Sequence, residues 1–231
     1  MEDVKLLGRE QVATGTQALH FTWPQGFEFK PGQAVDLVIP VGADPEARHA
    51  FSIASAPHEP ELVFATRMRD STYKRALGAL PVGAPARIDG PFGSMTLHKD
   101  ARRPAILVAG GIGITPFRSM VRQVAHEGAT RDILLVYSNR RPGDAAFLRE
   151  FEELAAREKR FRMVATMTEA GKDAPESRFI GAETLAEWSR GLERPVWYLA
   201  GPPAMVAAAR KALDTAGVDE MDVRSEEFAG Y

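Results

Sequence analysis

Residues Leu107 to Pro116 read LVAGGIGITP, the segment most informative about the fold. It begins as an apolar strand and ends as a helix, since proline is favoured at the start of a helix. The glycines between allow a sharp turn and close approach to a pyrophosphate, while the helix offers N–H groups and a positive dipole. The spacing is not G-x-G-x-x-G, so this is not the ordinary dinucleotide fingerprint. A tight turn without a ligand would also need small residues.

A second turn of this kind follows another apolar run, WYLAGPPAM, between Trp197 and Met205. Open α/β sheets bind ligands at the carboxyl edge, where loops from different strands converge. Two such turns in one sheet favour a dinucleotide crevice. The candidate nucleotide-binding residues are Gly110, Gly111, Ile112, Gly113, Thr115, Pro116, Gly201, Pro202 and Met205.

The second half of the chain alternates apolar runs with segments of helical periodicity. The runs cover 105–109, 132–137, 161–167 and 196–200, and the expected helices cover 116–127, 145–158, 182–190 and 204–216. Nearly continuous apolar strands are buried on both faces, as in a parallel sheet between helices. We therefore predict a doubly wound α/β domain with a parallel sheet.

The first half consists of short alternating or β-branched runs separated by turn residues. These runs cover 4–13, 18–23, 34–40, 48–55, 61–67 and 86–90, with one helix expected at 72–80. This pattern is typical of an antiparallel β-barrel or β-sandwich. With a boundary near Leu97 to Pro104, the sequence predicts a two-domain protein, with domains at 1–99 and 104–231.

Composition narrows the function. The 231 residues include 29 Lys and Arg, 31 Asp and Glu, and no cysteine. Without cysteine, the chain can form no disulfide, thiolate nucleophile or Cys-held metal site. No histidine is placed as an obvious metal ligand. The nearly equal numbers of cationic and anionic residues disfavour nucleic-acid binding. Because the sequence has no apolar leader or long apolar span, we expect a cytoplasmic protein without a membrane partner.

The segment RHAFSIAS, residues 48–55, places a cation four residues before a hydroxyl on an expected strand. Alternate residues of a strand share a face, so Arg48, Ala50 and Ser52 should point together. An Arg fork suits a diphosphate, and a Ser hydroxyl suits a neighbouring heterocycle. Considered alone, the pattern is better explained by a surface Arg on a strand.

Five segments together resemble the ferredoxin-NADP reductase family across nearly the whole chain. In order they are RHAFSIAS for the family's Arg-x-Tyr-Ser flavin motif, GPFG at 90–93, GGIGITP at 110–116, AGPPAM at 200–205 and EEFAGY at 226–231. The resemblance implies a flavin-binding barrel followed by an NAD(P)-binding domain. It also implies FAD as the flavin, with FMN as the alternative.

The resemblance further implies roles for individual residues. Arg48 would contact the flavin phosphates, Phe51 would flank the flavin ring, and Ser52 would lie near flavin N5. The other implied flavin contacts are Ala50, Ala65, Thr66, Arg67 and Lys74, the last where the family usually has Ser or Thr.

The resemblance assigns functions to the C-terminal residues as well. Tyr231 would stack over the flavin as a movable lid, and Glu227 could relay a proton. Thr115 would lie beside the nicotinamide as it delivers its hydride. A frayed chain end is the alternative reading for Tyr231.

The chain departs from the family at several positions. Phe51 replaces the motif's Tyr, and Ala200 replaces a frequent Cys before Gly-Pro. After the second α/β strand, Ser138, Arg140 and Arg141 favour the 2'-phosphate of NADPH. The segment after the third strand lacks the Arg that NADP-binding relatives often carry, so NADH stays open.

Three functions are compatible with these features. The first is an FAD-dependent oxidoreductase that takes a hydride from NAD(P)H and passes electrons to a separate carrier such as ferredoxin or flavodoxin. The second is an NAD(P)H:flavin reductase for which free flavin is a diffusible substrate, favoured by Phe51 and the compact size. The third is a non-catalytic module that senses flavin or nucleotide, favoured by Ala200. We rank them in that order.

Overall fold

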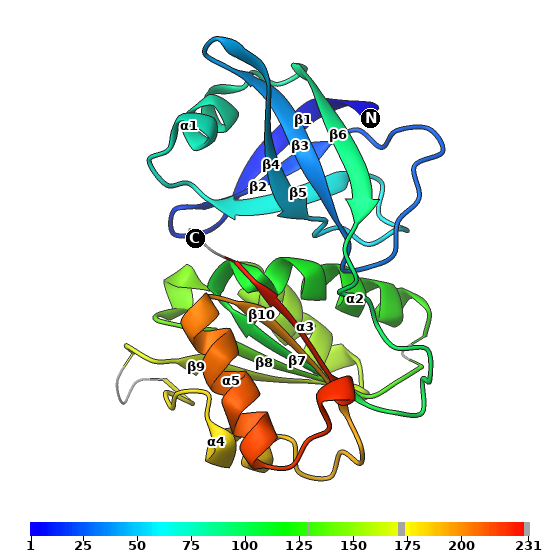
Figure 1. Ribbon diagram of the computed structural model, residues 1–231, viewed down its shortest axis with the longest axis vertical. Coiled ribbons are helices and arrows are strands. Elements are labelled where there is room, and N and C mark those ends of the chain that lie inside the picture. Colours follow the sequence, from blue (N-terminus) through cyan, green and yellow to red (C-terminus); the bar gives the residue numbers. More distant parts are fainter. Residues whose placement is uncertain (129, 171–173, 229–231) are drawn as a thin grey trace. The chain divides into compact units, whose positions relative to one another are not determined.

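The computed structural model describes residues 1–128, 130–170 and 174–228 (Figure 1). Contacts divide the chain into two compact units. The first contains residues 1–96 and 115–123, and the second contains 97–114 and the residues from 124 onward. The domain ranges predicted from the sequence assign all of 115–123 to the second domain, whereas the contacts group these residues with the first unit.

The first unit is built on an antiparallel sheet of six strands. They are β1 (Glu2–Ala13), β2 (Thr16–Phe21), β3 (Ala34–Val41), β4 (Asp44–Ser52), β5 (Leu62–Arg67) and β6 (Pro85–Phe92). The order is β4-β3-β6-β1-β2-β5. Just beyond β4, the Ala54 N–H donates to the Val63 carbonyl of β5 at 2.8 Å, so the two ends of the sheet curl toward each other. The predicted barrel-like antiparallel fold is confirmed.

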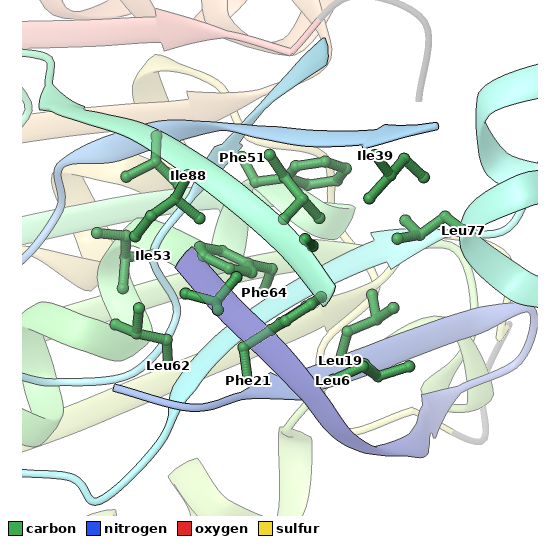
Figure 2. Close-up of a cluster of buried hydrophobic side chains, with 14 of the residues drawn as sticks. Leu6, Leu19, Phe21, Ile39, Phe51, Ile53, Leu62, Phe64, Leu77 and Ile88 are labelled. Atoms are coloured by element: carbon green, nitrogen blue, oxygen red, sulfur yellow. The ribbon is translucent and has the colours of Figure 1, made fainter. Parts of the chain in front are cut away.

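Apolar side chains from these strands fill the interior of the curled sheet (Figure 2). The rings of Phe21 and Phe64 lie 5.7 Å apart, and Phe51 is 4% exposed within the same cluster. Helix α1 (Thr72–Ala79) adds the fully buried Leu77. Its start is fixed by Ser71, whose hydroxyl accepts a hydrogen bond from the Lys74 N–H at 3.2 Å.

The second unit contains five parallel strands. They are β7 (Ala105–Gly110), β8 (Ile133–Asn139), β9 (Phe161–Met167), β10 (Val196–Gly201) and β11 (Val223–Glu227), in the order β11-β10-β7-β8-β9. The helices after β7 are α2 (Ile114–His126), α3 (Leu148–Arg157), α4 (Ala182–Trp188) and α5 (Pro203–Thr215). α4 and α5 cover one face of the sheet, where Trp188 and Leu213 share a core with Val108 and Leu199. The predicted doubly wound α/β fold is confirmed.

Three of the differences from the sequence predictions concern β11 and the starts of α2 and α3. Strand β11 was not predicted, because only Val223 in it is apolar and an edge strand needs little burial. α2 begins at Ile114 rather than Pro116, since a 3-10 turn at 111–113 leads directly into it. α3 begins at Leu148 rather than Ala145, after a 3-10 turn at 142–144 and a left-handed Phe147 with φ of 59°.

The strand order reverses between β7 and β10. From β7 the chain moves outward through β8 and β9, then returns to β10 on the other side of β7. Such a switch point in an open parallel sheet is where ligands bind, outside the carboxyl ends of the strands. Both predicted glycine turns follow these two strands, at Gly110 and Gly201.

Close packing at this point should make Gly113 intolerant of a side chain. A Cβ there would lie 2.2 Å from the Ala200 carbonyl oxygen, which is backbone and has little room to move. We expect Gly113→Ala to lower the free energy of unfolding by about 3 kcal/mol. Urea denaturation followed by tryptophan fluorescence measures the change.

The control is Gly8→Ala in β1, where a Cβ would meet nothing within 4 Å. It should change stability by less than about 0.5 kcal/mol. Equal stability of the two variants would contradict the packing described at Gly113.

Candidate functional site

The two glycine turns of the second unit touch each other. A Cβ on Gly110 would lie 2.5 Å from the Met205 sulfur, and one on Gly201 would lie 2.9 Å from the Gly110 nitrogen. The same Cβ on Gly110 would lie 2.8 Å from Cδ of Pro202. The structure therefore brings the two predicted turns together at the carboxyl ends of β7 and β10. The chain's own packing already requires Gly110, Gly113 and Gly201 to be glycines.

The first turn leads into α2 through backbone that favours glycine. Gly111 has a φ of +53°, and the Ile114 N–H bonds to carbonyls of the 3-10 turn. Ile112 and Thr115 are 5% and 3% exposed, and Pro116 lies in the first turn of the helix. The N-terminus of this thirteen-residue helix thus starts at the switch point, where its dipole favours an anion.

The C-terminal strand β11 pairs with β10 at the same edge. Glu227 lies opposite Gly201 and is exposed, and the next residue, Phe228, donates its N–H to the Gly201 carbonyl at 2.9 Å. Glu226 lies opposite Ala200, and burial raises the pKa of its carboxyl. Sequence reasoning selected Glu227 and missed Glu226, the less exposed of the two. Tyr231 lies outside the described residues.

The residues predicted to bind a 2'-phosphate lie at the end of β8. Ser138 was expected after the strand but is its penultimate residue, and Arg140 and Arg141 follow it. Ser138 is partly exposed, while the exposed Arg140 and Arg141 place guanidinium nitrogens 3.5 and 3.6 Å from the Glu169 carboxylate. Exposed ion pairs of this kind contribute at most about 1 kcal/mol to the free energy of unfolding. Both cations therefore face a carboxylate that an incoming phosphate would have to replace.

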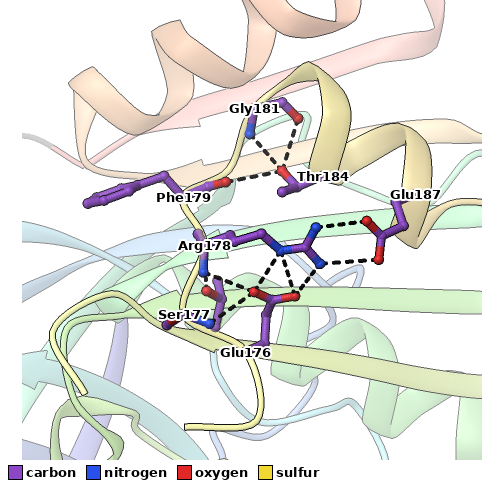
Figure 3. A network of polar contacts seen from close by, with 8 residues as sticks. Glu176, Ser177, Arg178, Phe179, Gly181, Thr184 and Glu187 are labelled. Atoms are coloured by element: carbon purple, nitrogen blue, oxygen red, sulfur yellow. Dashed lines mark hydrogen bonds and ion pairs between the residues drawn. The ribbon is translucent and has the colours of Figure 1, made fainter. Parts of the chain in front are cut away.

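A third cation, Arg178, lies beside the end of β9 (Figure 3). The Thr166 hydroxyl donates to its backbone carbonyl at 2.6 Å. Its guanidinium donates to Glu176 at 2.6 Å and to Glu187 at 2.7 Å. Hydrogen bonds from Arg178 lower the pKa of Glu176 to about 2. Sequence reasoning looked for a cation directly after the third strand and missed this one, which comes from the following segment.

In the first unit, the predicted flavin residues of β4 lie on two strand faces. Arg48, Ala50 and Ser52 alternate on one face, and the first two are exposed. Phe51 points to the other face, opposite Val35 and into the core. The predicted common face of Arg48, Ala50 and Ser52 is confirmed, but Phe51 does not share it.

His49 is a candidate that sequence reasoning missed. In an Arg-x-Tyr-Ser spacing the first residue lies two before the aromatic, and two before Phe51 is His49, not Arg48. The His49 ring lies 5.2 Å from Phe51 and 5.4 Å from Tyr73. Burial, then the charge of Lys74, lowers its pKa. Counting the motif's spacing from Phe51 would have found it.

Lys74 joins this cluster from α1. It is 6% exposed, its ammonium donates to the Thr66 hydroxyl, and its Nζ lies 4.8 Å from the centre of the Phe51 ring. Three residues predicted to bind flavin are thus brought together. Two others lie on β5, Ala65 buried and Arg67 partly exposed. Burial lowers the pKa of Lys74 to about 8, which is chemically suited to an anionic ligand that would compensate the buried charge.

Across the residues that the structure describes, no group of three or more His, Cys, Asp or Glu side chains is arranged to hold a metal ion. No helix within the described ranges is both long and apolar enough to cross a membrane.

The chain is similar in sequence to known oxidoreductases. Residues 107–211 match the family model of the oxidoreductase NAD-binding domain. The chain is 30% identical over 214 residues to the reductase component of propane 2-monooxygenase from Rhodococcus jostii, covering 89% of this chain and 57% of that protein. It is 35% identical over 149 residues to ferredoxin--NADP reductase B from Sorangium cellulosum, covering 64% and 61%. The chain thus spans less than two thirds of these relatives' lengths.

A solved ferredoxin NADP+ reductase from Neisseria gonorrhoeae has the same fold. It superposes with a TM-score of 0.82 at 19% identity, covering 97% of both chains. That structure contains bound FAD and NADP.

The buried charge of Lys74 has a consequence for stability. Because the folded protein gives up this proton at about pH 8 and the unfolded chain only near 10.5, the charge destabilises the fold most at neutral pH and less as pH rises. We expect Lys74→Met, without flavin, to have a higher Tm than the parent protein at pH 7. The difference should shrink at about pH 9.5, as measured by calorimetry.

Arg75→Met is the control, because Arg75 is the exposed neighbour of Lys74 in α1. Its effect on Tm should show no such pH dependence. A Lys74→Met difference that stays constant between the two pH values would contradict the burial of this charge.

Proposed function

Because the chain belongs to the ferredoxin-NADP reductase family, we propose that it is a flavin-dependent oxidoreductase that takes a hydride from NAD(P)H and passes electrons to a separate carrier. The observation that carries this proposal is the packing of two glycine turns at the switch point between β7 and β10. Both turns fall within the matched NAD-binding domain.

In this proposal residues 1–99 bind the flavin and residues 104–231 bind the nucleotide. Lys74 fits a flavin phosphate, since it is a buried cation beside a hydroxyl. FAD is the proposed flavin and FMN the alternative. Bound flavin would supply the redox chemistry, because its ring accepts a hydride and can release electrons singly.

The residues of this chain would act mainly by positioning. The turn at 110–113 and the start of α2 would hold the nucleotide's pyrophosphate through N–H groups and the helix dipole. Thr115 and Ser52 would offer hydroxyls to the nicotinamide and the flavin ring, and Glu227 would exchange a proton. Ordered placement of the reactants supplies most of the rate in such reactions.

The choice of nucleotide would depend on residues at the end of β8 and directly after it. Arg140 is the proposed partner of a 2'-phosphate, together with Ser138, the penultimate residue of the strand. NADPH would have to displace Glu169 from the two arginines, whereas NADH would leave these pairs intact. The proposal therefore includes both nucleotides.

The relatives suggest the kind of acceptor. Several are named as reductase or electron transfer components of monooxygenases and dioxygenases. We propose a protein acceptor of this class, either an oxygenase component or a small carrier such as ferredoxin or flavodoxin.

One observation favours a second function, the reduction of diffusible flavin. Phe51 is packed in the barrel core, on the strand face opposite Arg48 and Ser52. Because the Phe51 ring packs in the core, it would contribute less to flavin binding than an aromatic ring that contacts the flavin. The flavin would then bind weakly.

Dialysis followed by a visible spectrum distinguishes these two functions. The proposed reductase should stay yellow, whereas a colourless protein that oxidises NAD(P)H only with added flavin would support the second function. Lys74→Met should weaken flavin binding by about 1.5–3 kcal/mol, because it removes a buried charged donor. Titration of flavin fluorescence measures this.

Arg48→Ala is the matched comparison. Arg48 is exposed and lies 3.4 Å from Asp89, so its loss should cost less than about 1 kcal/mol of flavin binding. A larger loss from Arg48→Ala than from Lys74→Met would show that Arg48 contacts the phosphates although it stands one residue before the motif's first position.

A further inference from the structure

A buried arginine in α2 bonds to the segment that follows β4. Arg118 is 9% exposed, and its guanidinium donates to the Ala54 carbonyl at 2.8 Å. It also donates to both carboxylate oxygens of Glu59, at 3.1 and 3.2 Å. This two-pronged geometry fixes direction as well as distance. All of these residues belong to the first unit.

Glu59 is held as an anion from several sides. It accepts the Ala56 N–H at 2.6 Å and lies 3.2 Å from the guanidinium of Arg122. Burial alone would raise the pKa of Glu59, but Arg118, Ala56 and Arg122 together lower it. The ion pair with Arg118 is therefore charged at neutral pH.

A second connection runs parallel to the ion pair. Ser119, the next residue of α2, donates its hydroxyl to the Ser55 carbonyl at 2.7 Å. The Ser55 hydroxyl accepts the Val63 N–H of β5 at 3.0 Å. Two consecutive residues of α2 thus bind two consecutive carbonyls, so sliding by one residue would break both contacts.

We propose that Arg118 and Glu59 form a positioning pair that sets Thr115 relative to Ser52. Ala54 lies two residues after Ser52, and Arg118 lies about one helical turn after Thr115. The pair therefore joins the two short segments that carry these hydroxyls. A buried pair adds little net stability compared with an apolar pair of equal volume, but it fixes register. The inference rests on the proposed function, because Ser52 and Thr115 have catalytic roles only there.

Arg118→Met and Glu59→Gln test this, with ferricyanide as acceptor and flavin-loaded protein. We expect either variant to lower kcat for NADH or NADPH oxidation about 10- to 100-fold, while KM for the nucleotide and Kd for flavin change less than threefold. Arg118→Lys, which keeps the charge, should recover part of kcat. Glu59→Gln keeps the shape of the side chain, so it provides the same test if Arg118→Met does not fold.

Hydrogen exchange on the flavin-free protein gives a readout independent of turnover. Amides of residues 54–59 and 115–119 should exchange at least tenfold faster in Arg118→Met. Arg87→Met, which breaks an exposed pair with Glu46, should leave both exchange and kcat unchanged.

The outcomes separate this inference from the proposed function. Normal kcat in a folded Arg118→Met variant, or a loss confined to KM and Kd, would overturn the positioning role alone. If the parent protein oxidised neither nucleotide, the proposed function would fail and the inference with it.

Discussion

Close approach of backbone at the switch point of the parallel sheet is the constraint on which the second unit depends. A Cβ on Gly113 would lie only 2.2 Å from the Ala200 carbonyl oxygen, so this approach of the first turn to the end of β10 requires that residue 113 have no side chain. This contact brings the two turns and the N-terminus of α2 to one edge. A site for an anionic nucleotide then needs only exposed N–H groups and a favourable dipole.

The glycines explain why the sequence predicted this region well. Gly-rich turns after apolar strands have few structural solutions, so the strands, the following helices and the meeting of the turns could all be inferred from 107–116 and 197–205. The barrel strands were equally readable, because alternation of apolar and polar residues has a period of two. Tertiary contacts confirmed both fold classes.

What the sequence did not reveal depends on contacts between distant residues. Strand β11 is an edge strand whose polar residues carry no strand signal. The placement of Phe51 in the core follows from its pairing with Val35, which periodicity alone does not specify. Arg178 reaches the end of β9 from a separate segment, and Glu59 meets Arg118 across 59 residues. The candidate site was therefore predicted in its glycines and only partly in its charged residues.

The decisive measurement for hydride transfer is anaerobic titration of the flavin-loaded protein with NADH and with NADPH. We expect one equivalent of the preferred nucleotide to bleach the flavin absorbance completely, with an equal amount of nucleotide oxidised. Nucleotide that binds while the flavin stays oxidised would contradict it and support a non-catalytic module.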